Sequence, residues 1–169
     1  MGEVLWAPWR MQYIAASKSP EGCLFCTKLR EQRDAENLIL WRGQTTFVML
    51  NRYPYNNGHL MVVPVAHVPS LSALPGPQRA ELIDLTATCE AVLQQALRPH
   101  GFNIGLNLGS AAGAGVAEHL HVHVVPRWQG DTNYMTVVGE VRVIPQHLEA
   151  TYQQLLPYFR ALPTPEGGD

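Results

Sequence analysis

Residues 119–125 decide the fold, and they read His-Leu-His-Val-His-Val-Val. Polar and apolar residues alternate, and the β-branched valines favour a strand. Successive side chains of a strand point to opposite faces, so the three histidines share one face while Leu120, Val122 and Val124 share the other. We therefore expect a strand with one buried apolar face and a row of imidazoles on the opposite face.

Three histidines in register within five residues indicate chemistry rather than packing. Two uses stay open: a metal site, or imidazoles that act as nucleophile and general acid–base. Alternate residues of a strand lie about 6–7 Å apart at their Cα atoms, so three of them converge poorly on one tetrahedral ion. One or two of His119, His121 and His123 can therefore bind a metal while another carries out the reaction.

Directly upstream, residues 109–115 form a loop of small residues, Gly-Ser-Ala-Ala-Gly-Ala-Gly. Glycine lets the backbone approach a ligand closely, and successive N–H groups can hold an anion. Gly113 and Gly115 lack the third glycine of a dinucleotide-binding motif, and the chain has no lysine-containing phosphate loop. The position of this loop beside aligned imidazoles nevertheless indicates attack on a phosphoryl group.

The rest of the chain predicts an α+β domain on a mainly antiparallel sheet. Four further apolar runs bounded by turn residues are expected to be strands. These runs are residues 38–41, 46–51, 58–64 and 102–107. Apolar spacing over residues 77–97 predicts one long amphipathic helix, with Pro77 in its first turn and Cys89 as a small apolar residue. Shorter helices are expected at residues 24–33 and 144–160.

The composition indicates a folded protein and argues against nucleic-acid and membrane partners. Of the 169 residues, 46% are hydrophobic and 15% are charged, against about 25% charged in an average domain. The net charge of −2 argues against a nucleic-acid-binding face. No run approaches the roughly 18 apolar residues of a membrane-spanning helix. We expect neither a nucleic-acid nor a membrane partner.

Three segments are expected along the chain. Residues 1–22 form an extension packed on the domain, residues 23–162 form the domain, and residues 163–169 form a frayed tail. The extension contains Trp6 and Trp9, which are poor residues for a disordered tail. Its start lacks the basic and apolar runs of a secretory signal, so a cytoplasmic location is expected.

Together these segments resemble the histidine triad (HIT) superfamily of nucleotidyl hydrolases and transferases. Residues 119–125 match its H-φ-H-φ-H-φ-φ signature, and residues 51–64 (NRYPYNNGHLMVVP) are similar to its N-x-x-P…G-H-φ-φ-φ-x-P segment. Asn107 and the loop after it resemble its nucleotide-contacting stretch. The resemblance implies a five-stranded, mainly antiparallel sheet with one long and one C-terminal helix, in a homodimer whose sheets join.

Within the superfamily, three segments resemble the branch of fragile histidine triad hydrolases and bacterial diadenosine tetraphosphate phosphorylases. They are residues 6–13, 98–103 and 125–134. This resemblance implies cleavage of dinucleoside polyphosphates, to ADP and ATP with phosphate as acceptor or to AMP and ATP with water. Such phosphorylases often carry serine before the triad, where this chain has Gly115 and Val116, which puts the acceptor in question.

Two alternative functions stay open. One is a nucleoside phosphoramidate or adenylyl-ester hydrolase of the same fold. The other is a nucleotide-binding regulatory protein with negligible turnover. The complete set of His59, His121 and His123 favours an enzyme.

The resemblance also implies roles for individual residues. His121 is the implied nucleophile and forms a nucleotidyl–histidine intermediate, and His123 binds phosphate oxygens. His59 supports the triad through a hydrogen bond that fixes the tautomer of the nucleophile. The implied substrate contacts are Asn51 for ribose, Asn107 for phosphate or the bridging oxygen, the backbone of Gly113, Ala114 and Gly115 for phosphate, and Asn133 as a further contact.

Cys23 and Cys26 have the spacing of a zinc site, which needs two further ligands. His67 and His119 complete an arrangement that resembles many bacterial histidine triad proteins and the related galactose-1-phosphate uridylyltransferases. The four residues predict a structural zinc ion that leaves the other triad histidines for phosphate. The alternative is a reduced thiol pair with His67 on the surface. No organic cofactor is expected.

Overall fold

The computed structural model describes residues 22–131 and 147–163. Within them, a five-stranded antiparallel sheet has the strand order β1-β2-β3-β5-β4. The strands are Ile39–Arg42 (β1), Thr46–Leu50 (β2), Leu60–Pro64 (β3), Gly101–Gly105 (β4) and Val122–Arg127 (β5). The predicted α+β class and antiparallel sheet are confirmed.

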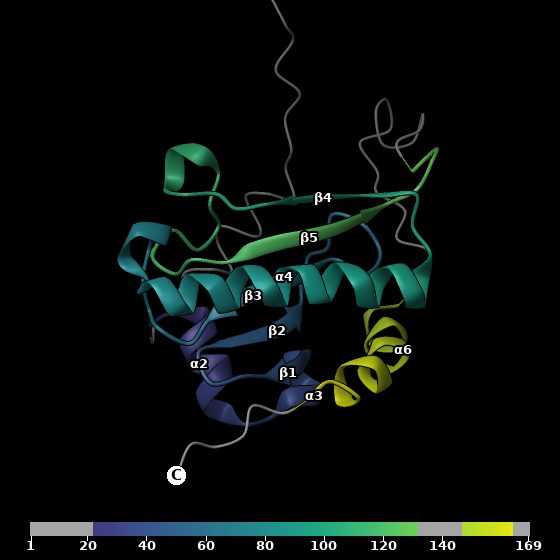
Figure 1. Ribbon diagram of the computed structural model, residues 1–169, viewed down its shortest axis with the longest axis horizontal. Coiled ribbons are helices and arrows are strands. Elements are labelled where there is room, and N and C mark those ends of the chain that lie inside the picture. The colour runs from purple at the N-terminus through teal and green to yellow at the C-terminus, as the bar shows by residue number, and fades with distance from the viewer. Residues whose placement is uncertain (1–21, 132–146, 164–169) are drawn as a thin grey trace, which may run out of the picture.

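Three of the described helices overlap the predicted ranges, and the short helix α3 was not predicted. They are α2 (Leu24–Glu31), α3 (Asp34–Asn37), α4 (Gly76–Leu97) and α6 (Leu148–Arg160), with 3₁₀ turns at Leu71–Ala73 (η1) and Ser110–Ala112 (η2). The long helix α4 carries Pro77 in its first turn, as expected. Figure 1 shows α4 crossing one face of the sheet with α6 beside it. Cys89 is fully buried on α4, and this burial raises the pKa of its thiol.

The two faces of the sheet bury different clusters. The larger cluster joins the sheet to α4 and α6, and its strand residues include Val48, Leu60, Val62 and Val124. The smaller cluster lies on the opposite face, where Phe25 of α2 packs with side chains of β1, β2 and β3. Because side chains alternate along each strand, the larger cluster fixes which residues remain for the other face.

The histidine-rich strand begins later than its alternating pattern predicts. The β3–β5 ladder ends at the pair Val62 and Val122, so His119 precedes the strand. Pro64 has no N–H group to donate, and its carbonyl accepts from Nε2 of His119 at 2.8 Å. The N–H of Leu120 donates instead to the carbonyl of Val68 at 2.7 Å. The side-chain alternation nevertheless continues through residues 119–121.

Several predictions concern residues that lie outside the described ranges. These include Asn133, residues 144–146 of the expected last helix, and all but the last residue of the 1–22 extension. Residues 164–169 of the expected tail also lie outside them. Among the described residues, no helix combines the length and apolar character needed to cross a bilayer.

Gly58 forms the turn that leads into β3. Its φ of +74° lies in the left-handed region, and a Cβ atom there would be 2.5 Å from Cδ1 of Leu97 and 3.3 Å from Cγ of Pro126. The turn therefore needs glycine for two reasons, its backbone conformation and its close approach to α4 and β5.

We expect Gly58→Ala to lower the free energy of unfolding by about 2–5 kcal/mol. The left-handed backbone costs about 1–2 kcal/mol for an L-residue, and overpacking adds about 1–3 kcal/mol. Gly109→Ala is the control, because Gly109 has a φ of +80° and open space where its Cβ would lie. Urea denaturation measures both variants. Equal losses would show that Leu97 moves aside without cost.

Candidate functional site

Three imidazoles lie in a row on the sheet face opposite α4. The ring centroids of His59 and His123 are 5.0 Å apart, and those of His121 and His123 are 4.8 Å apart. All three side chains are buried. The prediction that the triad histidines share one face is confirmed, because the rings of His119 and His121 both contact Phe25 while Leu120 joins the opposite core.

The tautomer of His121 follows from its neighbour. Its Nδ1 lies 2.9 Å from the backbone carbonyl oxygen of His119, which can only accept, so Nδ1 carries the proton. Nε2 then holds a lone pair, and this buried atom has no hydrogen-bond partner among the described residues. Burial lowers the pKa of His121, so the ring is neutral near pH 7. A buried unpaired acceptor is costly, which marks Nε2 as a position for a ligand.

His123 has the opposite arrangement of protons. The N–H of Tyr55 donates to Nδ1 of His59 at 3.0 Å, so a neutral His59 carries its proton on Nε2. That group donates to Nδ1 of His123 at 2.9 Å, which leaves the proton of His123 on its own Nε2. Burial, with a smaller contribution from His121, lowers the pKa of His123 to about 4. His123 therefore offers an N–H donor beside the lone pair of His121.

The partner predicted for His59 is wrong. The hydrogen bond of His59 goes to His123, whereas the tautomer of His121 is fixed by the backbone of His119. The strand register explains the difference. Met61 pairs with His123, so His59, two positions before Met61, is a diagonal neighbour of His123 and lies farther from His121.

The two predicted amide contacts have different surroundings. Asn51 is buried, and its Oδ1 accepts from the N–H of Tyr53 at 2.9 Å while its own N–H donates to the carbonyl of His59. Asn51 thus holds the loop that carries Tyr55 and His59, and its contact with ribose stays a prediction. Asn107 lines a cavity of about 420 Å³ that also touches His123.

Two N–H groups of the small-residue loop, residues 109–115, donate to carbonyl groups within the loop itself. The N–H of Gly113 donates to the carbonyl of Ser110 at 3.0 Å, and that of Ala114 donates to the carbonyl of Gly109 at 3.3 Å. Phosphate binding through these two N–H groups stays a prediction. Gly115 follows them at the end of the loop, and its contact with phosphate also stays a prediction.

The carboxylate of Asp131 forms a hydrogen-bonded anchor near the histidines that was not predicted from the sequence. The carboxylate of Asp131 accepts from Nε and Nη2 of Arg127 at 2.7 and 2.8 Å, from Nδ2 of Asn56 at 2.7 Å and from the N–H of Trp128 at 3.1 Å. The carbonyl of Asn56 accepts in turn from the N–H of His59 at 3.3 Å. The anchor therefore ties the end of β5 to the loop that positions His59. Its only sequence signal is the four-residue spacing between Arg127 and Asp131.

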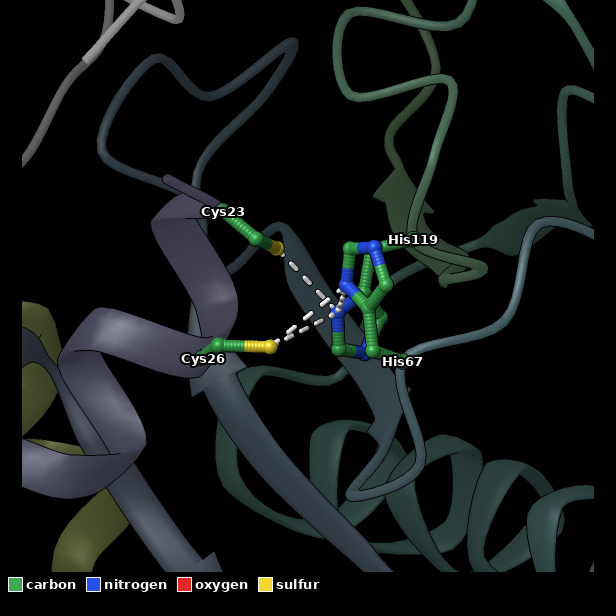
Figure 2. A group of neighbouring side chains, drawn as sticks. All are labelled: Cys23, Cys26, His67 and His119. Atoms are coloured by element: carbon green, nitrogen blue, oxygen red, sulfur yellow. Dashed lines mark hydrogen bonds between the residues drawn. The ribbon is translucent and has the colours of Figure 1, made fainter. Parts of the chain in front are cut away.

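A second group of side chains lies at the other end of the histidine row. Figure 2 shows Cys23 and Cys26 of the α2 region facing His67 and His119. The four ligand atoms lie within 4.8 Å of one another. The sequence analysis predicted all four residues, and the fold brings them together.

The cluster fits a tetrahedral metal ion. Sγ of Cys23 lies 3.2 Å from Nδ1 of His119, and Sγ of Cys26 lies 3.5 Å from Nδ1 of His67. Zinc bonds of about 2.0–2.3 Å place tetrahedral ligands roughly 3.3–3.8 Å apart, close to these separations. Nε2 of His119 donates to the carbonyl of Pro64, so its Nδ1 lone pair faces the cluster. Such an outer hydrogen bond is typical of metal-binding histidines.

Comparison with known proteins identifies the family. The HIT domain model matches residues 32–130. A relative from Mycobacterium tuberculosis, named AP-4-A phosphorylase, is 46% identical over 160 residues, which cover 89% of this chain and 81% of the relative. The chain therefore belongs to the HIT domain family.

Two further relatives are more distant. A Schizosaccharomyces pombe protein named asymmetrical bis(5'-nucleosyl)-tetraphosphatase is 29% identical over 93 residues, which cover 55% of this chain and 50% of that protein. Among solved structures, a Zn-bound histidine triad family protein from Mycobacterium smegmatis has a TM-score of 0.67 and 25% identity, covering 84% of this chain and 96% of that one. The structural similarity agrees with the fold described above.

We expect Asp131→Ala to lower the free energy of unfolding by about 1–3 kcal/mol, because it removes the acceptor of several donors and leaves them with poorer partners. It should also shift the imidazole ¹⁵N resonances of His59, whose loop the carboxylate holds. Asp84→Ala, on the exposed side of α4, is the matched control. Urea denaturation and NMR measure both variants, and a loss as small as that of the control would contradict the anchoring role.

Proposed function

We propose that this chain is a nucleotidyl transferase that cleaves dinucleoside polyphosphates, with diadenosine tetraphosphate as its substrate. The observation that carries the proposal is the buried Nε2 of His121, which has a lone pair and no described hydrogen-bond partner. Neutral imidazole attacks phosphorus without a separate base, and the N–P bond that forms is labile enough for a second acceptor to break. The names of the relatives in M. tuberculosis and S. pombe support this substrate class.

The reaction follows in two displacements. First, the lone pair on Nε2 of His121 forms a bond to the α-phosphorus, and the bond from that phosphorus to the bridging oxygen breaks. The leaving group departs with this electron pair as ATP, and the proton on Nδ1 of His121 stays against the carbonyl of His119. An oxygen of phosphate or water then forms a bond to the same phosphorus, and the N–P bond breaks with its electron pair returning to Nε2 of His121, which restores the neutral imidazole. An attacking water loses its proton to solvent. Phosphate gives ADP, and water gives AMP.

His123 stabilises the charge that develops on the phosphoryl oxygens. Its Nε2–H is a donor because Nδ1 already accepts from His59. A donor fixed in a buried site before the reaction starts typically contributes 10²–10³-fold to the rate. The Asn51, Asn107, Gly113, Ala114, Gly115 and Asn133 contacts remain part of this proposal.

We also propose that Cys23, Cys26, His67 and His119 hold a structural zinc ion. The donor set and its spacing support this assignment, and a similar solved structure is described as Zn-bound. The ion would tie α2 to the segments that follow β3 and precede β5. It would thereby hold the backbone of His119, whose carbonyl orients His121. A reducing compartment such as the cytoplasm would keep both thiols available.

A homodimer joined through β4 is the proposed assembly. β4 lies at the end of the sheet order, and its Ile104 is 44% exposed. An edge strand with an exposed apolar side chain is suited to pairing with a second copy. Joining two such edges would extend the antiparallel sheet across both subunits.

We expect His121→Asn to lose turnover by roughly 10³-fold or more while it still binds nucleotide, because asparagine cannot form the N–P bond. His147→Asn is the matched control, since His147 is exposed at the start of α6 and asparagine is a good helix cap. The turnover and the binding of diadenosine tetraphosphate are measured for both variants. Near-normal turnover of His121→Asn would end the covalent scheme.

The acceptor is tested by product analysis over a phosphate series. We expect ADP at high phosphate and competing AMP at low phosphate. Gly115→Ser should raise the ratio of ADP to AMP, because a hydrogen bond to a charged group is worth about 1.5–3 kcal/mol, or roughly 10- to 150-fold in affinity. Ala111→Ser adds a hydroxyl elsewhere in the loop as a control. AMP and ATP alone at every phosphate concentration would identify a hydrolase, and the absence of cleavage would refute the proposed function.

The zinc assignment predicts about one zinc ion per chain by elemental analysis. We expect Cys23→Ser to lose the metal and to lower the melting temperature without abolishing catalysis, because the ion ties segments together and does not contact substrate. Cys89→Ala is the control for metal content, since Cys89 lies on α4 away from the cluster. Metal-free protein with unchanged stability and activity would contradict the assignment.

A further inference from the structure

The ring of Phe25 contacts the proposed nucleophile. Its centroid lies 5.0 Å from that of His121 with an interplanar angle of 50°, and 5.3 Å from that of His119 with an angle of 66°. Phe25 lies in the first turn of α2, between Cys23 and Cys26 in the sequence. Its side chain is completely buried, so the ring faces other side chains and not solvent. One residue of α2 therefore packs against both histidines that precede β5.

The core on this face of the sheet holds Phe25 in place. The ring belongs to the smaller buried cluster together with Phe47 and Met49 of β2 and Met61 of β3. Side chains in close-packed apolar surroundings rest in one rotamer, and a change in their volume is felt by every neighbour. Phe25 therefore presents a rigid wall to the imidazole of His121.

A hydrogen bond and two ring contacts restrain the side chain of His121. Nδ1 donates to the carbonyl oxygen of His119 at 2.9 Å, and the rings of Phe25 and His123 contact the imidazole. A neutral hydrogen bond favours one orientation over another by only about 2- to 10-fold. A half-turn about the Cβ–Cγ bond would put a ring carbon against the carbonyl and would move the lone pair on Nε2 from its place. A fixed lone pair therefore needs packing as well as the hydrogen bond.

We propose that Phe25 is a positioning residue for the nucleophile, which keeps the ring of His121 in the orientation that directs Nε2 to the substrate. The inference rests on the proposed function and adds to it a residue that does not touch substrate. Phe25 acts through its shape, because its ring occupies the space that the imidazole would need to turn or to slide off its hydrogen bond. Cys23 and Cys26 flank Phe25, so a metal ion in the Cys/His cluster would hold the same turn of α2.

The first test measures the orientation of His121 without substrate. In the full-length protein labelled with ¹⁵N at histidine, the two ring nitrogens of His121 should give the separate resonances of a single tautomer. A turned ring no longer holds its proton against the carbonyl, so both of its tautomers are populated. We expect Phe25→Ala to reduce the separation of the two resonances by roughly 10–35%, because the hydrogen bond alone then favours the original orientation about 2- to 10-fold. Phe25→Leu retains more apolar volume and should reduce it less.

The second test separates the chemical step from binding. A misplacement of about 1 Å at a reacting atom costs on the order of 10²-fold in rate. We therefore expect Phe25→Ala to lower kcat for diadenosine tetraphosphate about 10- to 100-fold, and Phe25→Leu to lower it about threefold. Binding of a non-reactive analogue, with methylene groups in place of the bridging oxygens, should change less than about twofold in both variants, because Phe25 is buried away from the ligand.

Phe47→Ala and Phe47→Leu are the matched controls. Phe47 is also fully buried in the same cluster, but it lies on β2, which β3 separates from β5. These variants should lose as much stability in urea as the Phe25 variants, while the ¹⁵N separation is unchanged and kcat stays within about twofold. Elemental analysis reports the zinc content of every variant. Phe25→Leu decides the test if Phe25→Ala alone loses metal or fails to fold.

Two results would overturn the inference. One is a ¹⁵N separation and a kcat in the Phe25 variants that match those of the Phe47 variants, which would make Phe25 an ordinary core residue. The other is a loss of analogue binding as large as the loss of kcat, which would place Phe25 in contact with the substrate. A lack of turnover in the unaltered protein would instead refute the proposed function, and the ¹⁵N measurement would still decide what orients His121.

Discussion

Nδ1 of His121 donates to the carbonyl oxygen of His119 at 2.9 Å, and this contact decides where the lone pair of His121 lies. A carbonyl oxygen cannot donate, so the neutral ring has no alternative tautomer that satisfies it. The carbonyl is itself held in place, because the side chain of the same residue donates to Pro64 and faces Cys23 and His67. One residue, His119, thus joins the candidate metal cluster to the proposed nucleophile.

The tautomer of His123 depends on a longer series of hydrogen bonds. The N–H of Tyr55 sets the tautomer of His59, which sets that of His123. Burial keeps the rings of His121 and His123 neutral, since desolvation lowers both pKa values. His121 and His123 therefore present a lone pair and an N–H donor side by side without any net charge. Such a pair suits an anionic phosphoryl group, which a fixed carboxylate in the same place would repel.

Local alternation and spacing made much of this site predictable from the sequence. Residues 119–125 give the shared histidine face, and Cys23 and Cys26 mark the cluster, because both patterns depend on neighbours in the chain. The partner of His59 depends on the pairing register of β3 and β5, which no local pattern reports. Asp131 became part of the site only through contacts with a distant loop. The loop N–H groups likewise depend on how residues 109–115 close on themselves.

The hydrogen bonds around His119 also explain why β5 begins at Val122 and not at His119. Continuing the ladder by two residues would place Pro64 opposite Leu120, but the N–H of Leu120 donates to Val68 and the carbonyl of Pro64 accepts from the ring of His119. Releasing residues 119–121 from the ladder leaves the carbonyl of His119 available to His121, while Leu120 stays in the core as a fixed point. The proline at the end of β3 cannot donate to a continuing strand in any case. The irregular segment is therefore the feature that separates the Cys/His cluster from the proposed nucleophile within residues 119–121.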